Sequence, residues 1–262
     1  MDAPPQHVCA AFGVRGEQLE LLDSGGPVWR GGDVVLKPVA STAEAAWVAQ
    51  TLDALEVEGV RLARPLRSSD GRWVVAGWSA ARHLAGRHEP RHDEVVAVSL
   101  RLHRATASLP RPRFIGNRTD VWAVADRTAW GEVEAELDED SGGARFRELA
   151  AARRPVQLRQ QIVHGDLFGN VLFAGGAAPA VIDFSAYWRP PEWAAAVIVV
   201  DALAWGGADE NLTHRWAELA QWPQVLLRAL LFRLAAHALH PGSTPESLAG
   251  LRRAEVLVRE LL

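Results

Sequence analysis

The 262-residue sequence contains a single cysteine, Cys9, so an internal disulfide is excluded and nothing indicates an oxidising compartment. A long hydrophobic run is missing too. The longest, from Trp193 to Val200, ends at Asp201 and is far too short to cross a bilayer. The first residues lack the charged-then-apolar pattern of a signal peptide. We therefore expect a soluble, cytoplasmic globular protein.

An excess of positive charge is also absent, because the formal net charge is −4 and the pI is about 6.1. Proteins that bind nucleic acid or anionic membranes usually carry a basic surface, so we expect neither partner. Hydrophobic residues make up 48% of the chain, which is enough for one large domain or for two lobes with real cores.

Lysine is almost missing. Of the 28 lysine and arginine residues, Lys37 is the single lysine. It lies in the run VVLKPV, among apolar and β-branched residues. A compact ammonium group cannot be replaced by a planar guanidinium where space is tight. This setting favours a functional lysine over a surface residue retained by chance.

The hydrophobic pattern changes along the chain. Three short apolar runs separated by glycine turns, between residues 17 and 39, predict an antiparallel meander. Ser41, with Glu44 three residues later, predicts the start of a helix. From about residue 90 apolar residues recur at helical spacing, interrupted by short strands at 161–163, 171–173 and 180–182. We predict an α+β fold with a β-rich N-terminal lobe over 1–80 and a larger, mainly helical lobe over 81–262.

Two carboxylates and an amide follow or separate these short strands. Asp166 and Asn170 belong to the stretch IVHGDLFGNVLF, and Asp183 ends the run AVID. Oxygen ligands of this kind suit Mg²⁺, which takes one or two protein carboxylates together with phosphate oxygens. A carboxylate that is not bound to metal can position a hydroxyl nucleophile. The structural alternatives are a turn aspartate, a turn asparagine and a strand-end cap, respectively.

The stretch HGDLFGN followed by VIDF resembles the aminoglycoside phosphotransferase and choline kinase-like family, whose catalytic loop typically reads HGDxxxxN. The resemblance implies a protein-kinase-like fold with two lobes, the first binding nucleotide and the second carrying the catalytic loop, the metal loop and the acceptor site. It implies that Asp166 is the catalytic base, that Asn170 and Asp183 are metal ligands, and that His164 supports the loop.

The same resemblance assigns nucleotide-binding roles in the first lobe. Lys37 would contact the α- and β-phosphates, and Glu44 would pair with it, although a helix cap explains Glu44 equally well. Gly25 and Gly26 would form the turn over the phosphates, and backbone groups near Gly77 and Trp78 would bind adenine.

The sequence departs from the family pattern at three positions. Asn170 follows Asp166 by four residues rather than five, which moves the amide unless Gly169 adopts unusual dihedral angles. Ser185 follows Phe184 where protein kinases have glycine. Ala194 stands where the family often has a second aspartate, and Asp201, one helix further on, is a candidate replacement.

We therefore expect a phosphotransferase that uses ATP, or another nucleoside triphosphate, and Mg²⁺ to phosphorylate an alcohol group of an unidentified small molecule. The acceptor stays open between sugars, amino alcohols, aminoglycosides and other metabolites. Two other functions also stay open. The shortened loop favours a catalytically weak or inactive, pseudokinase-like regulator that binds nucleotide. A protein kinase is disfavoured by Ser185 and by the absence of an Ala-Pro-Glu segment.

Overall fold

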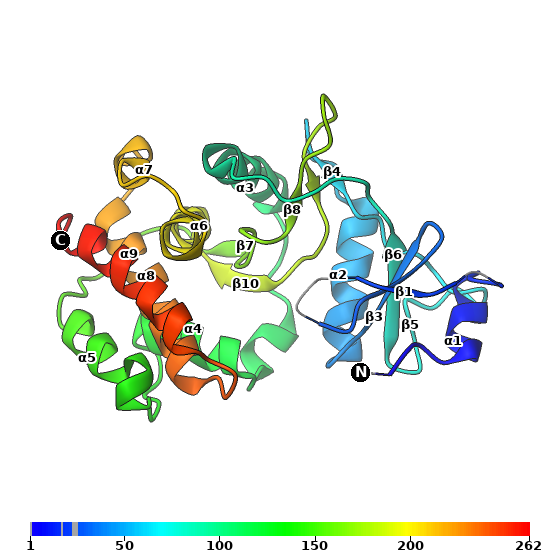
Figure 1. Cartoon of the computed structure of the whole chain (residues 1–262), viewed down its shortest axis with the longest axis horizontal. Helices are drawn as coiled ribbons and strands as arrows, with labels where there is room; N and C mark the ends of the chain where they lie inside the picture. The colour runs from blue at the N-terminus through cyan, green and yellow to red at the C-terminus, as the bar shows by residue number, and fades with distance from the viewer. Residues whose placement is uncertain (1, 17, 23–25) are drawn as a thin grey trace. The chain divides into compact units, whose positions relative to one another are not determined.

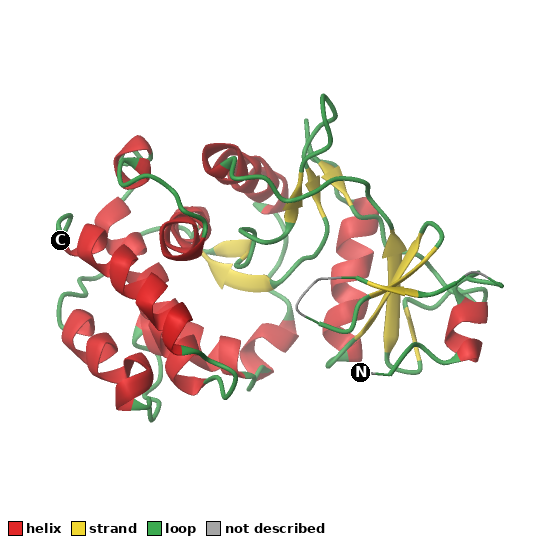
Figure 2. Cartoon of the chain, in the orientation of Figure 1, coloured by secondary structure: helices red, strands yellow, loops and turns green. Residues whose placement is uncertain are grey.

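The computed structural model describes residues 2–16, 18–22 and 26–262 (Figure 1). The chain divides into two compact units, Met1–His88 with Val171–Phe184, and Glu89–Asn170 with Ser185–Leu262. Figure 2 shows that most strands belong to the first unit and most helices to the second. Residues 171–184, predicted to belong to the second lobe, group with the first unit in this division.

The first unit is built on a five-stranded antiparallel sheet with the strand order β1-β2-β3-β6-β5. Its strands are β1 (Glu20–Leu21), β2 (Trp29–Gly31), β3 (Val34–Pro38), β5 (Val74–Val75) and β6 (Trp78–Arg82). The meander of β1, β2 and β3 confirms the prediction from the glycine turns. Strand β6 was not predicted, because its sequence WSAAR has no β-branched residue.

Two helices and a small sheet complete the first unit. Helix α1 (Gln6–Ala11) contributes Val8 to a buried cluster that also contains Leu36 of β3. Helix α2 (Thr42–Ala54) begins after Ser41, whose Oγ accepts a hydrogen bond from the Glu44 N–H at 3.3 Å, as predicted for a helix start.

The small sheet has the order β4-β9-β8 and joins distant parts of the sequence. Strand β4 (Arg61–Leu62) pairs in parallel with β9 (Ala180–Val181), which pairs antiparallel with β8 (Val171–Leu172). This pairing places the residues that follow β9, among them Asp183, in the first unit.

The second unit is mainly helical. Its elements are α3 (His92–Thr106), a 3₁₀ turn (Arg113–Asn117), α4 (Val121–Trp130), a π-helical turn (Glu139–Gly143), α5 (Ala144–Ala150), β7 (Gln161–His164), β10 (Ala186–Arg189), α6 (Pro191–Trp205), α7 (Leu212–Arg215), α8 (Trp222–Leu239) and α9 (Pro245–Arg259). Helices α6 and α8 are apolar around their circumference and are almost entirely buried. Strands β7 and β10 form an antiparallel pair in which His164 lies opposite Ala186.

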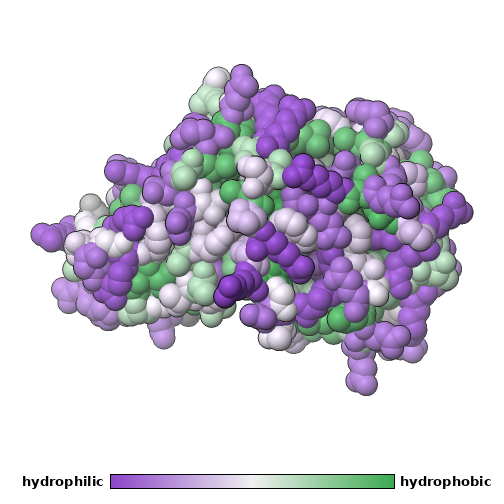
Figure 3. All heavy atoms as spheres, turned by 180° about the vertical axis from the view of Figure 1, so that it is seen from behind, coloured by the Kyte–Doolittle hydropathy of each residue, from purple (hydrophilic) through white to green (hydrophobic). Residues whose placement is uncertain are grey.

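The surface of the molecule is mixed in character. On the face shown in Figure 3, hydrophilic residues are interspersed with hydrophobic ones. Among the described residues, no helix has the length and apolar character needed to span a membrane.

Candidate active site

In the first unit, the single lysine meets a carboxylate that lies 146 positions later. Lys37 lies on β3 opposite Ser79 of β6, and its Nζ is 2.5 Å from Oδ1 of Asp183. The side chains are 42% and 41% exposed. An ion pair this exposed contributes only about 0–1 kcal/mol to stability. The pair is therefore better suited to contact a ligand than to hold the fold together.

The other predicted nucleotide-binding residues lie elsewhere in this unit. Glu44 is in the first turn of α2. Gly26 follows β1 and its carbonyl accepts a hydrogen bond from the Val28 N–H at 2.9 Å, whereas Gly25 lies outside the described residues. Gly77 (φ 79°) forms the turn between β5 and β6, and its carbonyl accepts a hydrogen bond from Val39 at 2.8 Å.

Trp78 is the first residue of β6 and lies opposite Pro38 of β3. The adenine-binding roles of Gly77 and Trp78 stay predictions.

In the second unit, two buried histidines fix the loop that follows β7. The Asp166 N–H donates to Nδ1 of His164 at 3.1 Å, and the His164 N–H donates to Nε2 of His103 at 2.9 Å. Burial lowers the pKa of His103 to about 3, so this ring is neutral and Nε2 can accept. Its Nδ1 lies 3.2 Å from Oγ of Ser99. The geometry supports the predicted role of His164 in holding the loop.

The shortened loop is closed by Asn170 itself. Its Nδ2 donates to the Asp166 carbonyl oxygen at 2.6 Å and lies 3.4 Å from Oδ2 of the same residue. Gly169 does not adopt a positive φ, so the loop closes without the unusual dihedral angles considered for this glycine. The amide oxygen of Asn170 is the atom suited to a metal ion.

A buried arginine that was not predicted from the sequence holds the Asp166 side chain. Arg233 of α8 donates through Nη2 to Oδ1 of Asp166 at 2.9 Å. The same guanidinium donates through Nε to Oδ1 of Asp201 at 2.7 Å and through Nη2 to Oδ2 of Asp201. Asp201 is 1% exposed, Arg233 7% and Asp166 48%. Asp201, the candidate replacement noted in the sequence, thus acts on Asp166 through Arg233.

Burial and neighbouring charges shift the pKa values of Asp201 and Arg233. Burial raises the pKa of Asp201 to about 6, although the Arg233 charge opposes the shift. For Arg233, burial lowers the pKa, but the two carboxylates outweigh that effect and hold it above its ordinary value. Arg233 therefore stays charged. The one sign of this role in the sequence was the position of Arg233 among the apolar residues of α8.

Asp166 lies at a pocket of about 370 Å³ formed entirely by the second unit. Trp122 and Trp205 line it and are unusually exposed for tryptophan, at 41% and 43%. Further lining comes from Phe168, His240 and Leu251. A half-exposed carboxylate at a pocket with aromatic walls can receive a small molecule and accept a proton from it.

The donor atoms available for a metal are oxygens. Within the part of the chain that the structure describes, no three His, Cys, Asp or Glu side chains form a cluster that would hold a metal alone. Asp183, in the first unit, and Asn170, in the second, each carry an oxygen of the kind that Mg²⁺ binds together with water and phosphate.

The chain resembles known proteins in sequence and in fold. Residues 28–187, more than half of the chain, match the model of the phosphotransferase enzyme family, a segment that includes Lys37, Asp166, Asn170 and Asp183. Among curated proteins, no sequence matches the chain.

Several solved structures share its fold. A microcompartment-associated aminopropanol kinase is 17% identical with a TM-score of 0.60, covering 97% of this chain and 94% of its own. The aminoglycoside phosphotransferase APH(4)-Ia, in a ternary complex with AMP-PNP and hygromycin B, is 18% identical with a TM-score of 0.59, covering 97% of both chains. The choline kinase LicA from Streptococcus pneumoniae is 9% identical with a TM-score of 0.59, again covering 97% of both chains. These comparisons confirm the predicted family resemblance and the protein-kinase-like α+β fold.

Proposed function

This chain belongs to the phosphotransferase enzyme family, and we propose that it transfers the γ-phosphate of ATP, with Mg²⁺, to an alcohol group of a small molecule. The observation that carries the proposal is the environment of Asp166, a half-exposed carboxylate at an aromatic pocket, fixed through one oxygen by a buried, charged arginine. Phosphoryl transfer requires chiefly positioning and charge stabilisation, and a carboxylate held in this way provides the first.

Lys37 and Asp183 are the proposed nucleotide contacts in the first unit. The Lys37 ammonium would bind the phosphates and Asp183 would hold Mg²⁺, and the family resemblance assigns Asn170 of the second unit as a further metal ligand. When bound, Mg²⁺ neutralises charge on the β- and γ-phosphates. A solved structure of similar fold contains AMP-PNP, which supports a nucleoside triphosphate as donor.

Asp166 is the proposed base. Its Oδ1 accepts from Arg233, whereas Oδ2 has only the longer contact of 3.4 Å with Asn170 Nδ2, so Oδ2 is the oxygen better able to accept or orient the proton of the acceptor hydroxyl. Asn170 limits the movement of the same loop through its bond to the Asp166 carbonyl. The acceptor would lie in the pocket walled by Trp122 and Trp205, with its hydroxyl toward Asp166.

The direct test is Mg²⁺-dependent release of ADP from ATP, measured against a panel of sugars, amino alcohols and aminoglycosides. We expect Asp166→Asn to bind nucleotide like the wild type and to lose about 10²–10⁴-fold in turnover, the usual contribution of a general base. Asp53→Asn, which alters an exposed carboxylate on α2, is the matched control and should retain full turnover.

Two outcomes would contradict the proposal. Near-normal turnover in Asp166→Asn would show that Asp166 is not the general base. Nucleotide binding with no ADP release on any acceptor would favour the inactive, pseudokinase-like alternative. A separate variant tests the first unit: Lys37→Ala should weaken nucleotide binding or turnover severely, and unchanged values for both would exclude the proposed phosphate contact.

A further inference from the structure

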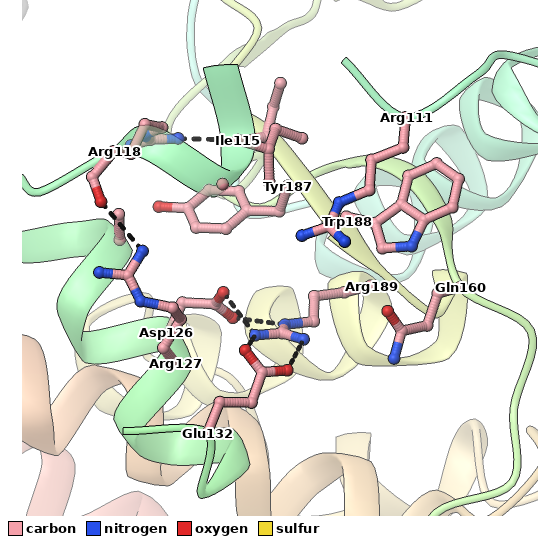
Figure 4. A pocket seen from close by; sticks show the side chains of 13 residues that line it. Arg111, Ile115, Arg118, Asp126, Arg127, Glu132, Gln160, Tyr187, Trp188 and Arg189 are labelled. Carbon is pink, nitrogen blue, oxygen red and sulfur yellow. Dashed lines mark hydrogen bonds and ion pairs between the residues drawn. The ribbon is translucent and has the colours of Figure 1, made fainter. Parts of the chain in front are cut away.

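A second pocket, of about 250 Å³, lies in the same unit and shares no lining residue with the Asp166 pocket. It lies beside β10 and α4, and Figure 4 shows its lining side chains. Arginines dominate its polar lining, namely Arg111, Arg118, Arg127 and Arg189. In a chain with a net charge of −4, such a concentration of guanidinium groups calls for a physical account.

Two of the arginines are neutralised by neighbouring carboxylates. Arg189 donates to both oxygens of Asp126, each at 2.8 Å, and to both oxygens of Glu132, at 2.6 and 3.0 Å. Arg118 donates to both oxygens of Asp120, at 2.9 and 3.0 Å. These interactions hold the walls of the pocket, and they pair Asp126, Glu132 and Asp120 with Arg189 and Arg118.

The other two arginines keep their charge. Arg111 is exposed, and neither Arg111 nor Arg127 forms an ion pair with any residue that the structure describes. Arg127 donates through Nη1 to the carbonyl of Arg118 at 2.9 Å, which anchors it in the wall. The four arginines carry four positive charges, and Asp126, Glu132 and Asp120 carry three negative charges. The site as a whole therefore carries a single positive charge.

The pocket also contains an unpaired hydroxyl group. Tyr187 of β10 is 5% exposed as a residue and lines the pocket, and its hydroxyl forms no hydrogen bond with the residues that the structure describes. Figure 4 shows this hydroxyl directed toward the side of the pocket formed by Arg118 and Arg127. Burial raises the pKa of Tyr187 well above its ordinary range, so the phenol stays protonated and can donate. A ligand oxygen in the pocket can therefore accept a hydrogen bond from this phenol.

We propose that this pocket binds a small organic carboxylate, with the carboxylate oxygens contacting the Tyr187 hydroxyl and the guanidinium groups of Arg127 and Arg111. A monoanion matches the single excess positive charge, whereas a dianionic phosphate ester does not. Ile115 and Trp188 supply apolar lining, which suits a ligand with a flat, apolar body.

This site adjoins the loop that carries Asp166. A Cβ placed on Gly165 would lie 2.4 Å from Cδ2 of Tyr187, so the ring packs directly against the loop backbone. A ligand on the Tyr187 hydroxyl therefore lies one side chain away from that loop. The inference concerns binding alone and does not depend on the proposed phosphotransfer reaction.

The test uses the full chain without nucleotide and a matched pair of probes, benzoate and its uncharged analogue benzamide, in titration calorimetry. We expect benzoate to bind and benzamide to bind at least about tenfold more weakly. Tyr187→Phe keeps the ring and removes only the hydroxyl, so it should weaken benzoate binding about tenfold, the size of one hydrogen bond to a charged group. Its melting temperature should change little, because the hydroxyl forms no hydrogen bond within the described part of the protein.

Further variants separate the site from general charge effects. Arg111→Gln should also weaken benzoate binding, whereas Arg252→Gln, which removes an exposed arginine from α9, should leave it unchanged. Equal affinity for benzoate and benzamide, no benzoate binding at millimolar concentration, or wild-type affinity in Tyr187→Phe would each overturn the proposal. Tighter binding of phenyl phosphate than of benzoate would overturn the assignment of a monoanion.

Discussion

The buried pair of Arg233 and Asp201 should dominate both the stability of the second unit and the placement of Asp166. In Arg233→Met the apolar part of the side chain is kept, but Asp201, 1% exposed, loses its cation. Removing one partner of a buried ion pair costs about 3–5 kcal/mol, because a charge is left in a poorly solvated site. We expect a loss of that size in the free energy of unfolding at pH 8, measured by urea denaturation followed by circular dichroism.

The pH dependence of that loss follows from the pKa of Asp201. Burial raises it from 3.8 to about 6, so between these values the folded protein binds more protons than the unfolded chain and stability falls as pH rises. Without the Arg233 charge the pKa of Asp201 rises further, and the fall continues above pH 6. At pH 5 the carboxyl is largely neutral in both proteins. The penalty of Arg233→Met should therefore be about half or less at pH 5 of its value at pH 8.

Two further variants serve as controls for Arg233→Met. Arg228→Met removes another buried arginine of α8, one that donates to Gln224 and to a backbone carbonyl, so its penalty should not change between pH 5 and pH 8. Asp201→Leu combined with Arg233→Met replaces the pair by apolar groups and should recover most of the lost stability. A loss below about 1 kcal/mol in Arg233→Met, or a double variant as unstable as the single one, would refute the argument.

Three more predictions concern the loop around Asp166. Gly165→Ala should disrupt the loop and lower stability by about 1–3 kcal/mol, because its Cβ would clash with Tyr187. Gly169→Ala should be tolerated, since nothing lies within 4 Å of its Cβ. Thermal denaturation and ADP release of the two variants test this difference. Burial holds the pKa of His103 near 3, so the unfolded chain binds the extra proton first and stability should fall by about 2 kcal/mol from pH 6.5 to pH 5. This fall is the contribution of His103 alone, and the Asp201 titration opposes it over the same range. It is therefore measured as the difference between the wild type and His103→Gln in denaturation curves at pH 6.5 and pH 5, and the same difference at both pH values would exclude the His103 contribution. Lys37→Arg should not restore the nucleotide affinity lost in Lys37→Ala, because a planar fork cannot replace a compact ammonium beside Asp183; full restoration would show that charge alone suffices.

The elements with a strong periodic or turn signal were predictable from the sequence. The meander, the start of α2 at Ser41 and the short strands that flank Asp166 and Asp183 all appear close to their expected positions. Strand β6 was missed because four of the five residues of WSAAR are not favoured in strands, and strand β10 was missed because AYWR, although it contains Tyr and Trp, is too short to show an alternating pattern. Their positions are fixed by pairing with β3 and β7, which is a tertiary effect.

The candidate site was predictable only in part, for a related reason. Motif spacing pointed to Lys37, Asp166 and Asp183, and the structure brings the first and the last together at 2.5 Å. Arg233 was invisible to this reasoning, because it belongs to no motif and lies 67 positions from Asp166. Its role appears only when helix packing places α6 and α8 side by side, so that Asp201 and Arg233 can pair.

The support of Asp166 also explains how the chain can depart from its family at Ala194. A carboxylate in a flexible loop needs fixed neighbours to keep its orientation. Here those neighbours are the His164 ring on one side of the loop and the Arg233 guanidinium on its side chain, both buried in the core of the second unit. A second aspartate close to the Asp183 loop is therefore not needed to hold Asp166, because Asp201 anchors Arg233 from within α6. It follows that the position of Asp166 is set by the second unit alone, whereas the Lys37–Asp183 pair is set by the first. Substitutions at Arg233 should accordingly reduce turnover while leaving nucleotide affinity unchanged, and a parallel loss of both would show that the two units do not act separately.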